Sequence, residues 1–327
     1  MFPKTRLRRL RGRRLQPLIR ETELHTTDLI APIFIDETIE HPVFISAMPG
    51  QSRIPPHEIQ STIQRLYEAG IRAVILFGIP IKKDATASSA YDDNGVIQQA
   101  VRSIRSTGSD MVVITDVCAC EYTDHGHCGI ITESGEYPDL DNDRSLDLMS
   151  SIAVSHAKAG ADIVAPSCML DGQVQAIREA LDEHGYTSIP ILSYSSKFAS
   201  ALYGPFREAA DSGYTCGDRT TYQIDPANGR EAFRESAFDL KEGADILMVK
   251  PAGLYLDILK DIRSLGVPVA AYQVSGEYAM IKAAAEQGWL DEQQVALESL
   301  TCIKRAGADL IITYFAEDVC RWLNEKR

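Results

Sequence analysis

The chain has 327 residues, 45% of them apolar, and a formal net charge of −13 at neutral pH. This length and composition fit a globular enzyme built as one large α/β unit. No run of eighteen apolar residues occurs, and the first segment lacks the apolar core of a secretory signal, so neither a spanning helix nor secretion is expected.

The N-terminal segment is basic, unlike the rest of the chain. Residues 1–20 contain eight lysines or arginines and no acid, which leaves 25 basic and 46 acidic residues, a charge of −21, in the remainder. This asymmetry predicts an arm that lies on an acidic protein surface, its own or a neighbouring subunit's. Nucleic acid or anionic lipid is the alternative partner, but the acidic body would repel both. We therefore expect residues 1–25 to form an arm for subunit contacts.

Eight short apolar runs predict β-strands, and segments with helical period lie between them. The period is clearest at Ile59, Ile63 and Leu66, and it recurs around Val174 and Val295. Gly-Ala-Asp precedes a predicted strand at 160–162, 243–245 and 307–309, as expected where a glycine ends a helix before a strand. The predicted strands are 29–35, 73–77, 111–115, 163–165, 189–193, 246–250, 267–272 and 310–314.

Eight alternating strand and helix units favour a closed α/β barrel, a (β/α)8 TIM barrel over residues 26–327, rather than an open doubly wound sheet. No Gly-x-Gly-x-x-Gly follows the first strand, which weakens a dinucleotide-binding alternative. In such barrels the active site lies at the carboxyl ends of the strands and in the loops after them. Two of these loops, residues 123–143 and 198–229, exceed the usual length and are candidate lids.

Two lysines are expected at that rim. Lys250 ends the apolar run that begins at residue 246, and residues 190–197 are expected to form a second strand that delivers Lys197 to the same rim. Burial favours the neutral amine, and two facing lysines lower each other's pKa, so each is a candidate nucleophile towards a carbonyl group. The alternative for each is a lysine whose ammonium group reaches solvent.

Three of the seven cysteines are clustered after the strand at 111–115. Cys118 and Cys120 face the same way if the chain is extended, and Cys128 is far enough along to return to them. An odd cysteine count in a large chain predicts a reducing compartment, here the cytoplasm, and clustering there favours a metal over a disulfide. Three thiolates leave one tetrahedral position open, as catalytic zinc requires; structural zinc or plain thiols are alternatives. For His125 and His127 we expect either a place near the metal or a role as polar loop residues.

Polar side chains near the same rim predict a ligand with carboxylate groups. Arg207 and Arg219 can clamp a carboxylate with forked hydrogen bonds, or remain solvated loop charges. Tyr272, Ser275 and Tyr314, near the ends of the last two strands, can donate hydroxyl groups to a second carboxylate, or be buried core hydroxyls.

Several long motifs together resemble the porphobilinogen synthases, also called 5-aminolevulinate dehydratases. The resemblance implies a (β/α)8 barrel with an arm that embraces a neighbour, usually within an octamer. It also implies condensation of two 5-aminolevulinate molecules into porphobilinogen with loss of two waters. The matching segments include Arg-Leu-Arg at 6–8, Ala-Met-Pro-Gly at 47–50, Asp-Val-Cys-Ala-Cys-Glu-Tyr-Thr at 116–123, His-Gly-His-Cys-Gly at 125–129, Asp-Gly-Gln-Val at 171–174, residues 193–207, Met-Val-Lys-Pro at 248–251 and Tyr-Gln-Val-Ser-Gly-Glu-Tyr at 272–278.

The resemblance assigns the chemistry to two lysines and three cysteines. Lys250 would form a Schiff base with one substrate and Lys197 with the other. Cys118, Cys120 and Cys128 would hold the catalytic zinc that binds and polarises the second substrate.

The resemblance also assigns binding residues. Asp116 and Ser167 would line the pocket. Glu235 matches a ligand for an allosteric magnesium ion, which one glutamate binds only through several retained waters. Thr221 stands where animal relatives carry a further cysteine, so a second zinc is not predicted. The two substrate carboxylates would be held by Tyr203, Phe206, Arg207, Arg219 and Gln223 on one side and by Ser275 and Tyr314 on the other.

Two other functions remain open at this point. A class I aldolase on the same barrel needs one Schiff-base lysine but no site of three thiolates. A nucleic-acid-binding protein, from a different class, would use the basic arm, although we expect no nucleic-acid or membrane partner.

Overall fold

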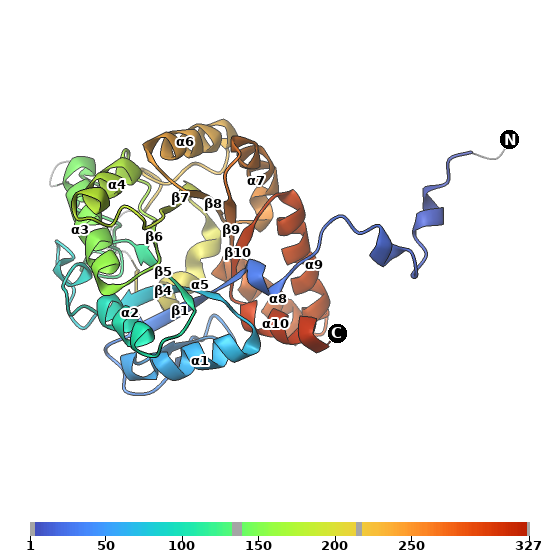
Figure 1. Ribbon diagram of the computed structural model, residues 1–327, viewed down its shortest axis with the longest axis horizontal. Coiled ribbons are helices and arrows are strands. Elements are labelled where there is room, and N and C mark those ends of the chain that lie inside the picture. The colour runs from blue at the N-terminus through green and yellow to red at the C-terminus, as the bar shows by residue number, and fades with distance from the viewer. Residues whose placement is uncertain (1–3, 133–138, 214–217, 326–327) are drawn as a thin grey trace.

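A computed structural model describes residues 4–132, 139–213 and 218–325. Eight parallel strands form a ring with helices outside it, in the order β6-β5-β4-β1-β10-β9-β8-β7 (Figure 1). This arrangement confirms the predicted (β/α)8 barrel. The strands are β1 (Leu29–Asp36), β4 (Ala73–Ile79), β5 (Val112–Val117), β6 (Ile163–Pro166), β7 (Leu192–Lys197), β8 (Ile246–Lys250), β9 (Val269–Gln273) and β10 (Leu310–Thr313).

The ring closes where β6 meets β7. In the part of the chain that the structure describes, one parallel bridge between Val164 and Ile191 joins this edge, and the Val164 N–H donates to the Pro190 carbonyl at 3.2 Å. Pro166 and Pro190 have no N–H, so they remove two possible donors from this joint. The β6–β7 seam therefore has few hydrogen bonds.

Helices cover the outer face of the barrel strands (Figure 1). The face of α1 that carries Ile59, Ile63 and Leu66 is buried, which confirms the helical period seen in the sequence. The helices are α1 (Ile59–Ala69), α2 (Val96–Ser106), α3 (Asn142–Ala159), α4 (Gln173–Glu183), α5 (Gly204–Ala209), α6 (Gly229–Glu242), α7 (Leu256–Ile262), α8 (Ser275–Glu286), α9 (Glu292–Ala306) and α10 (Ala316–Glu325).

The Gly-Ala-Asp repeats connect helices to strands through both their glycine and their aspartate. Gly160 ends α3 with a φ of 106°, a left-handed conformation that glycine adopts at little cost. The Asp162 N–H then donates to the Val113 carbonyl at 2.9 Å, while the Asp162 carboxylate accepts the Val113 N–H at 2.7 Å. Each aspartate thus ties the start of its own strand to the strand beside it. The same reciprocal pair joins Asp245 to Ile191 and Asp309 to Val269.

The predicted and observed barrel strands agree to within two residues at each end, except in β7. The apolar run covers only 189–193, whereas β7 spans Leu192–Lys197 and ends at the lysine that the sequence predicted this strand to deliver to the rim. Its second half is rich in serine, and α6 satisfies the hydroxyl groups. The Ser193 hydroxyl donates to the Asp239 carboxylate at 2.6 Å, and the Ser196 hydroxyl donates to the Ala232 carbonyl at 3.0 Å. These polar residues are therefore buried without an apolar pattern.

Two local elements were not predicted. A hairpin of β2 (Val43–Phe44) and β3 (Ser52–Ile54) follows β1, and the short helix α5 lies in the predicted lid loop 198–229. In Figure 1 α5 lies over the centre of the strand ring. Parts of both lid candidates, residues 133–138 and 214–217, lie outside the described residues.

The N-terminal arm extends away from the barrel (Figure 1). Short 3-10 helices at Leu7–Leu10 and Gln16–Leu18 contain no buried residue. In the described ranges, none of the helices combines the length and the apolar character that crossing a membrane requires.

Candidate active site

Lys197 and Lys250 are the last residues of β7 and β8, and they pair in register. Each residue is 5% exposed, so both amines lie inside the barrel mouth. The structure therefore brings the two predicted lysines together at the carboxyl ends of neighbouring strands.

Four aromatic rings surround the amine of Lys250. Its Nζ lies 4.4 Å from the ring centre of Tyr272, 5.0 Å from those of Tyr194 and Phe206, and 5.4 Å from that of Tyr203. Burial, together with the charge of the neighbouring Lys197, lowers the pKa of Lys250 to about 7. A large fraction of this amine is thus neutral near pH 7, and a neutral amine attacks carbonyl groups.

The second lysine lies in a different electrostatic setting. Lys197 Nζ donates to the Ser167 carbonyl at 2.6 Å, across the β6–β7 seam. Burial acts to lower the pKa of Lys197, but the charges of Cys128 and Cys118 outweigh it, and the pKa lies above its ordinary value.

Three buried cysteines form a compact group of sulfur atoms. The Sγ atoms of Cys118, Cys120 and Cys128 all lie within 4.8 Å of one another, and those of Cys118 and Cys120 are 3.3 Å apart. Hydrogen bonds with the thiols of Cys118 and Cys120 hold the pKa of Cys128 well below its usual value. Thiolates at these distances fit a tetrahedral zinc ion, which leaves a fourth position for a further ligand. Cys216 lies outside the described residues.

Two carboxyl groups border the sulfur atoms. Asp116 accepts a hydrogen bond from the Ser167 hydroxyl at 3.1 Å, and Glu121 Oε2 lies 3.3 Å from Cys120 Sγ. Burial raises the pKa of both groups, and that of Asp116 reaches about 7. Glu121 was not predicted as a site residue, although its place directly after Cys120 is a signal that could have indicated it.

His125 and His127 lie beside the cysteines without joining them. The His127 N–H donates to His125 Nδ1 at 3.1 Å, and His127 Nδ1 lies 3.2 Å from the Tyr222 hydroxyl. Within the described part of the chain, neither histidine belongs to a close group of metal-ligating atoms.

One pocket combines most of the predicted site residues. Phe206 of α5 packs edge-on against Phe77, with ring centres 5.3 Å apart, and so covers the barrel mouth. Arg219 donates to the carbonyls of Gly126 and Ser212 at 2.9 and 3.1 Å, while its buried Nε has no acceptor among the described residues. The lining residues are Phe77, Asp116, Cys120, Glu121, Ser167, Lys197, Tyr203, Phe206, Arg207, Arg219 and Lys250.

The predicted second carboxylate site does not line this pocket. The hydroxyl groups of Tyr272 and Tyr314 are 3.0 Å apart, and the Ser275 hydroxyl accepts the Phe206 N–H at 2.9 Å. Gln223 lies in a different pocket. Tyr272, Ser275 and Tyr314 therefore lie close to Lys250 or to α5 but contact other protein groups, while the buried Nε2 of Gln223 has no acceptor among the described residues.

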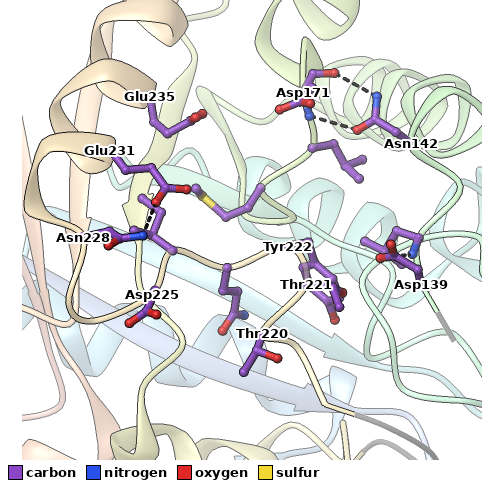
Figure 2. Close-up of a pocket in the computed structure, with 15 residues that line it drawn as sticks. Asp139, Asn142, Asp171, Thr220, Thr221, Tyr222, Asp225, Asn228, Glu231 and Glu235 are labelled. Atoms are coloured by element: carbon purple, nitrogen blue, oxygen red, sulfur yellow. Dashed lines mark hydrogen bonds between the residues drawn. The ribbon is translucent and has the colours of Figure 1, made fainter. Parts of the chain in front are cut away.

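That other pocket has a volume of about 460 Å³ and an acidic lining. Glu231 and Glu235 project into it from α6, opposite Asp171, which is held by Asn142 (Figure 2). Burial and the charges of nearby carboxylates together raise the pKa of Glu235 to about 7. Thr221 also lines this pocket. Because Glu235 belongs to no close group of three ligand atoms in the described ranges, an ion there would keep most of its waters.

Comparisons with known proteins agree on one family. The family model for delta-aminolevulinic acid dehydratase matches residues 4–322. A delta-aminolevulinic acid dehydratase of Archaeoglobus fulgidus is 54% identical over 323 residues, covering 98% of this chain and 99% of the relative. One from Halalkalibacterium halodurans is 52% identical over 314 residues, covering 96% and 94%.

A solved structure is similar over nearly the whole chain. It is the delta-aminolevulinic acid dehydratase (porphobilinogen synthase) of Toxoplasma gondii ME49, in complex with the reaction product porphobilinogen. The two share 41% identity and a TM-score of 0.96, with 99% of this chain and 93% of the other covered.

Proposed function

This chain belongs to the delta-aminolevulinic acid dehydratase family, and we propose that it condenses two 5-aminolevulinate molecules into porphobilinogen through lysine Schiff bases beside a zinc ion. The family supports the overall reaction, a lyase step of tetrapyrrole synthesis that releases two waters. The observation that carries the chemical proposal is the register pairing of Lys197 with Lys250 at one pocket.

Lys250 supplies the more reactive amine. Its pKa of about 7 lets it attack the ketone of one substrate as a neutral amine. A C–N bond forms, the carbonyl oxygen leaves as water, and the resulting Schiff base makes the adjacent carbon easier to deprotonate. The four surrounding rings hold this group in a water-poor site.

Because the pKa of Lys197 is raised, its ammonium group must first give up a proton, which the Asp116 carboxylate in the same pocket can accept. The neutral amine of Lys197 then forms the Schiff base with the second substrate. Its place opposite Lys250 holds the two ketones close together, which favours bond formation between two molecules of the same compound. Asp116 lines the same pocket, and its pKa of about 7 suits it to accept or release a proton there.

The thiol groups of Cys118, Cys120 and Cys128 would hold the zinc ion. When bound, zinc supplies Lewis acidity towards the second substrate without a redox change. The second lysine and the sulfur cluster distinguish this site from that of a class I aldolase, which needs neither.

Separate groups hold the two substrate carboxylates. Arg207 and Arg219 line the pocket and provide forked donors for one of them. Ser275 and Tyr314 hold the other, at the start of α8 and after β10, once substrate replaces their present partners. Tyr203, Phe206, Gln223 and Tyr272 complete the two binding sites.

The acidic pocket and the arm concern regulation and assembly. Glu235 binds a magnesium ion through retained waters, which its acidic surroundings favour. The basic arm of residues 1–25 contacts a second copy of the chain in a homo-oligomer, consistent with its exposed position. Native mass, measured with and without magnesium, tests both points.

An activity assay tests the proposed reaction. The chain is incubated with 5-aminolevulinate, zinc and a thiol reductant, and the pyrrole product is measured by its colour reaction. Product formation that requires both zinc and reduced thiols supports the proposal. No product under these conditions would contradict it.

A further inference from the structure

Glu277 is a buried carboxylate that connects the loops after β8 and β9. It lies in the first turn of α8 and is 7% exposed. Its Oε1 accepts the Gly253 N–H at 2.6 Å, and its Oε2 accepts the Val274 N–H at 2.7 Å. Burial raises the pKa of Glu277 to about 7, although these N–H groups act against that shift. Burying a carboxylate costs free energy, and these two hydrogen bonds offset the cost of burying Glu277.

The contact with Glu277 leaves no room for a side chain at Gly253. A Cβ at position 253 would lie 2.3 Å from Glu277 Oε1, closer than two such atoms can approach. Only glycine brings its N–H so near the carboxylate. The loop that leaves Lys250 is therefore attached to α8 three residues after that lysine.

The other side of the same carboxylate fixes the first residues of α8. Val274 precedes Ser275, whose hydroxyl accepts the Phe206 N–H at 2.9 Å. Phe206 in turn lies 5.0 Å from Lys250 Nζ, measured to its ring centre. These contacts form a closed path. From Lys250 the chain leads to Gly253, whose N–H binds the Glu277 carboxylate. The same carboxylate fixes the start of α8, where Ser275 contacts Phe206, and the ring of Phe206 lies beside the Lys250 amine.

We propose that Glu277 is a positioning residue which sets the spacing between Lys250 and Ser275, and thereby the length of keto acid that forms a Schiff base at Lys250. The inference rests on the proposed function, because it takes Ser275 as a holder of the substrate carboxylate. The ketone carbon then reaches Lys250 only when the chain between ketone and carboxylate matches that spacing.

Trapping with borohydride measures this spacing directly. The amine of Lys250 adds to a ketone and water leaves, and borohydride then delivers hydride to the C=N carbon to give a stable secondary amine. Three probes are compared on the zinc-loaded chain: 4-oxopentanoate, its longer homologue 5-oxohexanoate, and butanone, which has no carboxylate. Peptide mass spectrometry locates and quantifies the adduct on Lys250.

The informative variant is Glu277→Gln, with Glu286→Gln at the far end of α8 as its matched control. The amide places a donor against one of the two N–H groups, so one hydrogen bond to a charged acceptor is lost. The concentration of 4-oxopentanoate that half-saturates trapping should rise about tenfold to about a hundredfold. The concentration of butanone that half-saturates trapping should change by less than about threefold. The ratio of the half-saturating concentrations of 5-oxohexanoate and 4-oxopentanoate should become smaller. The control should match the parent chain.

A double-mutant cycle separates positioning from general damage. Gly253→Ala should reproduce the loss seen in a Glu277→Ala variant, and the double variant should be little worse than either, because the clash disappears with the carboxylate. Equal losses for 4-oxopentanoate and butanone in Glu277→Gln, or no loss for either, would overturn the positioning role. An absence of any Lys250 adduct in the parent chain would instead refute the Schiff-base proposal beneath it.

Discussion

Lys197 and Lys250 are register partners on β7 and β8, yet their surroundings move the two pKa values in opposite directions. Burial, followed by the charge of Lys197, lowers the pKa of Lys250, whereas at Lys197 the charges of nearby cysteines together outweigh the effect of burial. The pair therefore offers one neutral amine and one ammonium group near pH 7, so the two lysines of this pocket differ chemically.

The first prediction concerns the pH dependence of Schiff-base formation. Because the pKa of Lys250 is lowered to about 7 from its ordinary 10.5, the neutral fraction of this amine rises as pH increases through about 7. The rate of borohydride trapping of 4-oxopentanoate on Lys250 should therefore rise with pH and level off above about pH 8. A midpoint near the ordinary lysine value would show that the amine is not desolvated.

The second prediction is the loss of activity when the Lys250 amine is removed. Lys250→Met keeps a long apolar side chain among the four rings, so the barrel should remain folded. Porphobilinogen formation should fall by about a thousandfold or more, because the nucleophile is absent. Lys260→Met, at an exposed position of α7, is the matched control and should retain activity. Substantial activity in Lys250→Met would assign the essential Schiff base to another lysine.

The third prediction distinguishes a catalytic from a structural metal. Cys120→Ala should abolish stoichiometric zinc binding and most activity, because two thiolates remain of three. The thermal midpoint of unfolding should change little, since the three cysteines follow β5 and belong to none of the strands or helices of the barrel. Cys302→Ala on α9, away from the sulfur cluster, should bind zinc normally. Loss of the cooperative unfolding transition in Cys120→Ala would indicate structural zinc.

The fourth prediction concerns the attachment of α5. The Ser46 hydroxyl and N–H donate to Glu208 Oε1 at 2.6 and 3.1 Å, and Lys83 forms an ion pair with Asp211 at 2.7 Å. Glu208→Gln should loosen the helix that carries Phe206 and raise KM about twofold to about tenfold, with a smaller effect on kcat. Glu183→Gln on α4 serves as the exposed control. An unchanged KM would mean that these contacts do not position α5.

The fifth prediction uses a buried histidine outside the active site. His156 on α3 is 1% exposed, and its ring nitrogens have no partner among the described residues. Burial lowers its pKa from 6.5 to about 3, a difference worth at most about 5 kcal/mol. The unfolded chain therefore binds the proton first, and this contribution to stability is lost as pH falls from about 6.5 towards about 3.

Urea unfolding at several pH values tests this fifth prediction. His156→Leu should flatten the decline in the free energy of unfolding between about pH 6.5 and about pH 4, while His57→Leu at an exposed position should not. The same slope in His156→Leu and the parent chain would assign the acid sensitivity to other groups.

The strands that are buried on both faces were the easiest to predict. The apolar run of β8 agrees with the structure at both ends, from Ile246 to Lys250. In contrast, the apolar run at 189–193 covers only the start of β7, because Ser193 and Ser196 are satisfied by a helix distant in sequence, and hydropathy contains no information on that partner. The aspartates of the Gly-Ala-Asp repeats were missed for the same reason, since their role is a contact with the next strand.

The candidate site could be predicted as a set of residues but not as a geometry. Barrel topology placed Lys197 and Lys250 on one rim, and the register between them follows from the parallel sheet. The proximity of Glu121 to the thiol of Cys120 depends on how the loop turns, which residue spacing does not determine. The contact of Ser275 with Phe206 likewise depends on α5, a helix too short to give a periodic signal.

The joint between β6 and β7 gives the barrel an asymmetry in backbone pairing. Among the described residues, one bridge between Val164 and Ile191 joins β6 to β7, whereas four residue pairs join β7 to β8. The hydrogen bond from Lys197 Nζ to the Ser167 carbonyl therefore adds a side-chain contact across the seam that has the fewer backbone pairs. If Lys197 bonds a ketone, as proposed above, this contact across the seam is lost, while Lys197 and Lys250 remain paired between β7 and β8.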